Sequence, residues 1–474
     1  MRDVGVSAMS VAIPACRVDL RDFCQWTGGD PEKTLAVVGS AFRIADRDES
    51  VYTLAANAVI RLIDQNGLDP RQIGYLALGT ESSTDNAAGA VIVKGLVDRA
   101  LAPRGQSLAR NIEVPEFKHA CLGGVYALKS ALRYVATDGA GRQAIVVAAD
   151  LAEYARGSTG EPTQGAGAVA MLVEAAPRLF RVSLEGGSSA AYREVDFRKP
   201  VRRYAYDPVP AEGRVHDFPV FNGKYSTACY TDAVRCALTD LAVRRQQSLY
   251  ALLQSVDAFF FHRPYAKMPQ DGLSATLVAA LAETDGPLEA LGLNGETVRR
   301  ELESAILDAA IARRGDEPFP ETGRAVRALR GTEHATWCRE KLALGAGPMR
   351  ELGNLYTAAL PAWLAAGLEE AAERGVDLEG KRLMAVGYGS GDAAEAFELE
   401  VVPGWREAAG RIGLQAALAR QLTLTEAQYH ALHERGDAGK LPYPRGQEVV
   451  LEAVGHTETA AFSDRGIEYY RWLD

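Results

Sequence analysis

Short apolar runs alternate with amphipathic stretches along most of this chain. Five runs have the length and composition of buried β-strands, and they lie at 73–78, 144–149, 166–172, 258–261 and 383–386. Stretches with the helical period lie between them, at 52–66, 120–137, 231–249 and 356–374. This alternation predicts an α/β architecture.

The order of these elements also predicts how the chain is divided. Two halves repeat a loose sequence of helix, strand, chemistry-bearing turn and helix, and we expect them at 1–200 and 201–474. The Pro/Arg/Tyr-rich stretch from about 198 to 219 has the composition of a long connection between them. Residues from about 265 to 347, with charged segments such as 296–314, predict a largely helical, solvated insertion that packs over the core.

Composition narrows the class of protein. The 474 residues are 47% hydrophobic and 24% charged, and they contain neither an apolar run long enough for a bilayer nor a secretory signal. Six cysteines at 16, 24, 121, 229, 236 and 338 lack paired metal spacing, so we expect no disulfide scaffold, no zinc site and a cytoplasmic location. The net charge of −10 opposes nucleic-acid binding but leaves room for a local basic patch that holds a phosphate.

The segment CLGGV at 121–125 predicts a reactive thiol. Apolar positions at 121, 125, 128, 132 and 135 share one helical face, which places Cys121 at the start of a helix. A helix N-terminus stabilises a thiolate and lowers a thiol pKa below its usual value of about 8.5. Gly123 and Gly124 each cost about 1 kcal/mol of helix propensity, and they would let a substrate or a facing strand approach the sulfur. The alternative is a buried structural cysteine.

Three further polar residues occupy strand or helix ends. Glu81 follows the run 73–78, His262 ends the run 256–261, and Asn354 lies near the start of the 356–374 helix. Ligands bind outside the carboxyl ends of strands in open α/β sheets. Taken singly, these residues also suit a surface glutamate, a structural histidine and a helix cap. Together with Cys121 they supply the thiolate, base and carbonyl polariser that covalent acyl chemistry requires.

Five short segments carry a resemblance to a known family, namely GTES at 79–82, ACLGG at 120–124, FHRPYAK at 261–267, GNLYT at 353–357 and YGSG at 388–391. Through these segments the chain resembles the 3-hydroxy-3-methylglutaryl-CoA synthases of the thiolase superfamily. The resemblance implies a duplicated αβαβα thiolase-like fold, usually a homodimer, that condenses acetyl-CoA with acetoacetyl-CoA. It implies CoA thioesters as substrates and neither a cofactor nor a metal.

The resemblance also implies a role for each matching residue. Cys121 would take the acetyl group, and Glu81 would be the general acid/base that removes a methyl proton from acetyl-Cys121 and protonates the new alkoxide. His262 would position the second thioester and polarise its ketone. Water would then release the product from Cys121. Contacts to the acyl groups or to the CoA phosphates are implied for Tyr154, Thr163, Asn354, Ser390 and Lys267.

Two departures from the family pattern concern the acyl carrier. Glu161 and Gln164 stand where the family commonly has a basic residue and a glycine, and acidic residues continue after Gly391. We expect the charge reversal at Glu161 to change how a carrier is held. The second acyl group would ride either on CoA or on an acyl carrier protein, as in polyketide β-branching. One alternative is a ketosynthase III-like enzyme that performs a Claisen condensation, but that class of enzyme lacks an essential glutamate at the position of Glu81. A non-catalytic scaffold is a further alternative, and it is disfavoured because Glu81, Cys121 and His262 are all present.

Overall fold

A computed structural model describes the whole chain except residues 1–2, 140, 200–217, 221 and 285. Its strands form a nine-stranded sheet in the order β5-β4-β6-β7-β1-β8-β11-β10-β9. Their bounds are β1 (Val4–Ala12), β4 (Ile73–Gly79), β5 (Glu116–Phe117), β6 (Gln143–Ala152), β7 (Gly165–Ala175), β8 (Phe180–Ala190), β9 (Ala258–Phe261), β10 (Arg382–Gly389) and β11 (Ala393–Val401). Strands β1 and β8 pair only through Gly5–Arg181 and Val6–Phe180, so the sheet has two parts that meet at a narrow seam.

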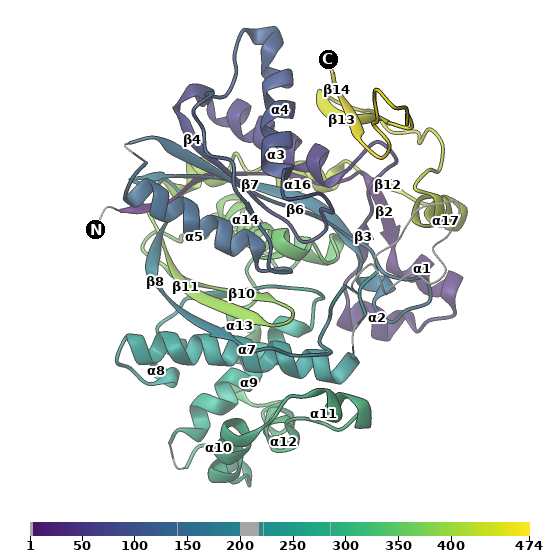
Figure 1. The fold of residues 1–474 in the computed structure, drawn as a ribbon. Coiled ribbons are helices and arrows are strands. Elements are labelled where there is room, and N and C mark those ends of the chain that lie inside the picture. The colour runs from purple at the N-terminus through teal and green to yellow at the C-terminus, as the bar shows by residue number, and fades with distance from the viewer. Residues whose placement is uncertain (1–2, 140, 200–217, 221, 285) are drawn as a thin grey trace.

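Helices and the two parts of the sheet stack in five layers, from top to bottom in Figure 1. Helices α3 and α4 cover one outer face, α5 and α14 fill the centre, and α7 and α9 cover the other outer face. The helices are α3 (Val51–Asn66), α4 (Gly89–Leu101), α5 (Gly123–Ala136), α7 (Gly223–Arg244), α9 (Met268–Ala282) and α14 (Ala359–Glu373). This arrangement confirms the predicted α/β, thiolase-like layering.

The layers are built from one repeated unit. The order β1-α3-β4-α5-β6-β7 in the first half recurs as β8-α7-β9-α14-β10-β11 in the second. Pairing repeats as well, because β4–β6 and β9–β10 are parallel whereas β6–β7 and β10–β11 are antiparallel. The ends of β4 and β9 and the starts of α5 and α14 are therefore equivalent positions, and these are the places where the candidate residues lie. The division at 200/201 stays a prediction, and most of the expected connection at 198–219 lies outside the described residues.

Each of the five apolar runs is a strand of the sheet, because both faces of these strands are covered by helices. Strands β1, β5, β8 and β11 were not predicted. Strand β5 has two residues, β8 is only half-buried, and β11 carries glutamates that form ion pairs. The helix expected at 231–249 begins earlier, as α7, and a separate helix α8 (Leu249–Gln254) follows it.

The region after β9 is helical, as expected. It comprises α9, α10 (Gly295–Ser304), α11 (Ala309–Arg314), α12 (Pro320–Ala328) and α13 (Glu333–Lys341). Helix α9 is buried and packs against α7, so it belongs to the outer layer rather than to a solvated insertion. The more polar helices beyond it form the lower end of the molecule in Figure 1.

The remaining elements lie around this core. A small sheet of β12 (Leu422–Thr423), β2 (Cys16–Asp19) and β3 (Ala41–Arg43) packs near α1 (Leu20–Thr27), α2 (Pro31–Val37) and α17 (Glu426–Arg435). Helices α15 (Trp405–Ala409) and α16 (Leu414–Ala419) pack on α14, and the hairpin of β13 (Glu448–Val454) and β14 (Glu468–Leu473) packs on α3 and α4. Within the described ranges, no helix has the length and apolar character that crossing a membrane requires.

Candidate active site

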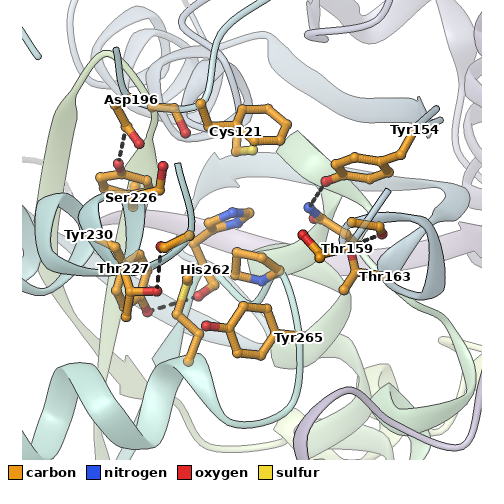
Figure 2. A pocket seen from close by; sticks show the side chains of 18 residues that line it. Cys121, Tyr154, Thr159, Thr163, Asp196, Ser226, Thr227, Tyr230, His262 and Tyr265 are labelled. Atoms are coloured by element: carbon orange, nitrogen blue, oxygen red, sulfur yellow. Dashed lines mark hydrogen bonds between the residues drawn. The ribbon is translucent and has the colours of Figure 1, made fainter. Parts of the chain in front are cut away.

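The candidate residues surround a cavity of about 200 Å³ at the place where the two repeats meet (Figure 2). Figure 2 shows the Cys121 sulfur and the His262 ring facing this space. Six of the residues singled out in the sequence line it, namely Cys121, Tyr154, Thr163, His262, Asn354 and Ser390. Glu81 reaches the same site through a contact with Cys121. The structure thus brings together residues from both halves of the chain.

Cys121 is buried and lies just before α5, whose N-cap is Leu122. Its Sγ donates a hydrogen bond to Oε2 of Glu81 at 3.2 Å. Burial raises the pKa of the Cys121 thiol well above its usual value, and the negative charge of Glu81 raises it further. The expectation of a thiolate stabilised by a helix N-terminus is therefore wrong for the free protein. Desolvation and the adjacent carboxylate both favour the protonated thiol.

Glycines allow the end of β4 to lie directly against the start of α5. A Cβ atom on Gly79 would lie 2.5 Å from the Cα of Gly124, and one on Gly124 would lie 2.8 Å from the carbonyl oxygen of Thr357. Any side chain at either position would force the backbones apart. The close approach expected at Gly123 and Gly124 is confirmed, and it is what brings Glu81 within reach of Cys121.

A buried carboxylate that the sequence analysis missed holds the Glu81 loop in place. Oδ1 of Asp150, in β6, accepts hydrogen bonds from the backbone N–H groups of Glu81 and Ser82, both at 2.8 Å, and from Oγ1 of Thr80 at 2.9 Å. Its Oδ2 accepts from the N–H of Thr357 at 2.9 Å. One side chain therefore joins the base-bearing loop of the first repeat to the loop that precedes α14. An acidic residue directly after the apolar run 144–149 was a signal that could have identified it.

We expect Asp150→Asn to destabilise the protein by about 1–3 kcal/mol, because the new amide donor would face the N–H of Thr357 and leave a buried group unpaired. Turnover should also fall, since the Glu81 loop loses its anchor. Urea unfolding and a condensation assay would measure both effects. Asp316→Asn, which removes an exposed ion pair with Arg314, is the matched control and should change little. Equal unfolding free energies for the two variants would contradict the anchoring role.

His262 follows β9 and is fixed through its backbone. Its N–H donates to the carbonyl of Val386 at 2.7 Å, and its carbonyl accepts from the Tyr230 hydroxyl at 3.0 Å. The imidazole lies nearly parallel to the Tyr388 ring, with centroids 6.3 Å apart. Burial lowers the pKa of His262 to about 3, so the ring is neutral at physiological pH. Its Nδ1 is buried and has no hydrogen-bond partner among the described residues.

Asn354 has both a structural and a cavity-facing role. Its Oδ1 accepts from the N–H of Tyr356 at 2.9 Å, as in a cap, while its Nδ2 donates to the Tyr154 hydroxyl at 3.4 Å. Gly353 before it has φ +75°, and a Cβ there would lie 1.7 Å from the carbonyl oxygen of Gln164. The backbone therefore requires glycine at 353, and this turn points the Asn354 amide into the cavity.

The residues that depart from the family pattern are paired inside the protein. Glu161 is buried, forms an ion pair with Arg156 at 3.0 Å and accepts from the Tyr429 hydroxyl at 2.7 Å. Gln164 accepts from the N–H of Tyr154 at 3.1 Å and donates to the Tyr429 hydroxyl at 2.8 Å. Its charge is paired with Arg156 and its carboxylate helps to hold α17 against the Tyr154 loop, and the expectation that Glu161 changes how a carrier is held stays a prediction.

The acidic residues after Gly391 are mostly neutralised as well. They form ion pairs at 2.5–2.9 Å that do not involve the cavity, namely Glu395 with Lys129, Glu398 with Arg245 and Glu400 with Arg181. Asp392 is the exception, because the Nε of Arg193 lies 3.6 Å from its Oδ2. The acidic stretch therefore presents little free charge to a phosphate-bearing substrate.

Lys267 does not line the Cys121 cavity. It pairs with Asp271 on the next turn of α9 and lines a neighbouring cavity of about 320 Å³ between α7, α9 and α12. Thr227 lines both cavities, so the two lie next to each other. Contact of Lys267 with a CoA phosphate stays a prediction.

Several cavity residues were not singled out from the sequence. They are Thr159, Asp196, Phe197, Ser226, Thr227, Tyr230, Tyr265, Met268 and Tyr388. Tyr265 and Tyr388 lie within the similar segments at 261–267 and 388–391, which was the available signal. Asp196 and Phe197 precede the predicted connection, and nothing in the pattern marked them.

Comparisons with known proteins agree with this geometry. The family model described as hydroxymethylglutaryl-coenzyme A synthase N terminal matches residues 1–177, and the corresponding C-terminal model matches residues 204–437. The hydroxymethylglutaryl-CoA synthase of Haloferax volcanii is 29% identical over 92% of both chains, and erg13B of Aspergillus fumigatus is 28% identical over 85% of this chain and 83% of its own.

Solved structures are similar over the entire chain. MvaS in complex with 3-hydroxy-3-methylglutaryl coenzyme A is 27% identical with a TM-score of 0.77, and both chains are fully covered. The HMG synthase of the curacin biosynthetic pathway in complex with holo donor-ACP shares the fold at 21% identity and a TM-score of 0.70, again with full coverage of both chains. With both family models matching in order around a shared cavity, the chain belongs to the hydroxymethylglutaryl-CoA synthase family of condensing acyltransferases.

Proposed function

We propose that this enzyme condenses acetyl-CoA with acetoacetyl-CoA to form hydroxymethylglutaryl-CoA. The observation that carries the proposal is the 3.2 Å contact between Cys121 Sγ and Glu81 Oε2 beside a cavity that His262 and Asn354 also line. A nucleophile, a base and carbonyl-directed polar groups thus share one enclosed space. The relatives named as hydroxymethylglutaryl-CoA synthases and the product-bound MvaS structure support the choice of substrate.

The first half-reaction transfers an acetyl group to Cys121. The sulfur attacks the thioester carbonyl, the carbon–sulfur bond to CoA breaks, and the proton of the Cys121 thiol ends on the departing CoA thiol. One thioester replaces another, so no oxidant or reductant is needed. Burial of Cys121 keeps its acetyl thioester away from bulk water until the second substrate arrives.

The second half-reaction forms the carbon–carbon bond. Glu81 removes a methyl proton from acetyl-Cys121, and the resulting carbanion adds to the ketone carbon of acetoacetyl-CoA. The neutral His262 ring and the Asn354 amide polarise that ketone, and Glu81 returns a proton to the new alkoxide. Water then hydrolyses the Cys121 thioester and releases the product.

The acyl carrier can be tested by a direct comparison of substrates. We expect acetyl-CoA with acetoacetyl-CoA to give hydroxymethylglutaryl-CoA, detected by mass, at a higher rate than acetyl-CoA with an acetoacetyl carrier protein. Product from the carrier protein alone would overturn the choice of CoA and favour β-branching. Carbon dioxide released from a malonyl thioester would favour a Claisen condensation, and the absence of any acetyl label on Cys121 would favour a non-catalytic scaffold.

We further propose a cytoplasmic homodimer that uses no organic cofactor and takes its acyl groups from thioester substrates. All six cysteines are free, which suits a reducing compartment. Lys267 is proposed to contact a CoA phosphate from the cavity beside the acyl site, after exchanging its bond with Asp271 for the ligand. Size-exclusion chromatography with light scattering tests the dimer.

A further inference from the structure

Three ligand-type side chains converge at the wall of the acyl cavity, close to His262 but outside the proposed chemistry. They are Asp196, Cys229 on α7 and Asp392 in the turn between β10 and β11. One ligand atom of each lies within 4.8 Å of the other two. The three residues are 1%, 0% and 3% exposed, respectively, so water does not solvate them from outside.

Three of the four carboxylate oxygens in this cluster have no hydrogen-bond partner among the described residues. Among the described residues, neither oxygen of Asp392 has a hydrogen bond, and Oδ1 of Asp196 has none. The nearest cation, Nε of Arg193, lies 3.6 Å from Oδ2 of Asp392, which is longer than a hydrogen bond. Oδ2 of Asp196 accepts from the Tyr388 hydroxyl at 2.7 Å and from the N–H of Gly391 at 3.3 Å. Burying a carboxylate without a hydrogen-bond partner costs folding free energy. A bound cation is one explanation for such unpartnered buried groups.

The net charge around the cluster is one that a single divalent cation would neutralise. Asp232, the other acid nearby, pairs with Arg235 at 2.7 Å and with Arg193 at 2.8 Å. If Arg235 balances Asp232, Arg193 is the remaining cation that the described residues place against the two carboxylates and the thiolate. A divalent ion would neutralise the remaining two negative charges.

We propose that Asp196, Cys229 and Asp392 bind a divalent transition-metal ion, with Zn²⁺ the best match. A thiolate ligand disfavours Mg²⁺ and Ca²⁺, which prefer oxygen donors alone, whereas Zn²⁺ accepts sulfur and carboxylate together. Zinc bonds of about 2.3 Å to sulfur and about 2.0–2.2 Å to oxygen require the three donors to draw slightly closer together. The Tyr388 hydroxyl would orient Asp196 from outside the site.

The spacing of the cysteines gave no sign of this site because its donors come from three separate segments. The ion would have a positioning role, since Tyr388 connects the site to His262 by ring stacking and to Asp196 by a hydrogen bond. It would restrict the motion of Tyr388, and thereby of the His262 ring that stacks on it, without touching the reacting atoms. The proposal is independent of which acyl carrier the enzyme uses.

Cobalt titration of the metal-free protein tests the proposal, because a thiolate ligand gives Co²⁺ a sulfur charge-transfer band in the near ultraviolet. We expect one Co²⁺ per chain with this band, displaced by Zn²⁺. Cys229→Ser should abolish the band, and Asp392→Asn should weaken binding at least about tenfold. Cys236→Ser, on the same helix, is the matched control and should bind like the native chain.

Three results would each overturn the proposed site. They are a native chain that binds no Co²⁺, a charge-transfer band that survives Cys229→Ser, and an equal loss of Co²⁺ binding in Cys229→Ser and Cys236→Ser. Circular dichroism checks that the variants fold. If Cys229→Ser does not fold, thermal unfolding with and without Zn²⁺ decides between the outcomes. Zn²⁺ should raise the Tm of the native chain and leave that of Asp392→Asn unchanged, and an equal shift in both would count against the proposal.

Discussion

Glu81→Gln is expected to accept an acetyl group on Cys121 and to form almost no carbon–carbon bond. The amide has the size of the carboxylate but cannot take a methyl proton, and loss of a positioned general base costs about 10²–10⁴-fold in rate. Acetyl transfer should persist, because the charge of Glu81 is one of the causes that raise the pKa of the Cys121 thiol. Removing that charge makes the thiolate easier to form.

Two measurements on the same variant separate these steps. Labelled acetyl-CoA followed by peptide mass analysis reports acetyl-Cys121, and product mass after addition of acetoacetyl-CoA reports condensation. Glu407→Gln is the matched control, since that side chain is 80% exposed. Condensation at the native rate would refute the role given to Glu81, and loss of acetylation would mean that Glu81 is also needed to deprotonate the thiol.

Cys121→Ala should carry no acetyl label and should make no product. The alanine removes the atom that forms the thioester, and loss of a catalytic nucleophile lowers turnover by on the order of 10⁴–10⁶-fold. Folding should be retained, because the change deletes one sulfur atom at the edge of an existing cavity.

A matched control is available within the same chain. Cys24, on α1, is also buried but does not line the Cys121 cavity, so Cys24→Ala removes a buried sulfur away from the chemistry. It should keep both the label and the product. An acetyl label that persists in Cys121→Ala, or is lost in Cys24→Ala, would show that another residue accepts the acyl group.

The parts of the fold that could be predicted are those determined by local pattern. Strands such as β4 and β9 are covered on both faces, so they appear in the sequence as continuous apolar runs. Glu81 and His262 directly follow these runs, and the repeated topology carries both to one cavity. The same rule would have identified Asp150, which follows a run of the same kind.

The parts that could not be predicted depend on contacts between distant residues. The raised pKa of the Cys121 thiol arises from burial and from a partner 40 residues away. The internal role of Glu161 requires Tyr429, which lies 268 residues further along the chain. Family comparison treats Glu161 as a change in surface charge, whereas its burial can only be seen once the chain is folded.

The bonds from α17 to the Tyr154 loop have a consequence for biosynthesis. Tyr429 and His433 hold Glu161, Gln164 and the carbonyl of Tyr154 from near the C-terminal end of the chain. During translation the loop beside the nucleophile therefore lacks these contacts until α17 has left the ribosome. The Tyr154 loop can therefore take its final hydrogen-bonded arrangement only after residue 433 has been synthesised.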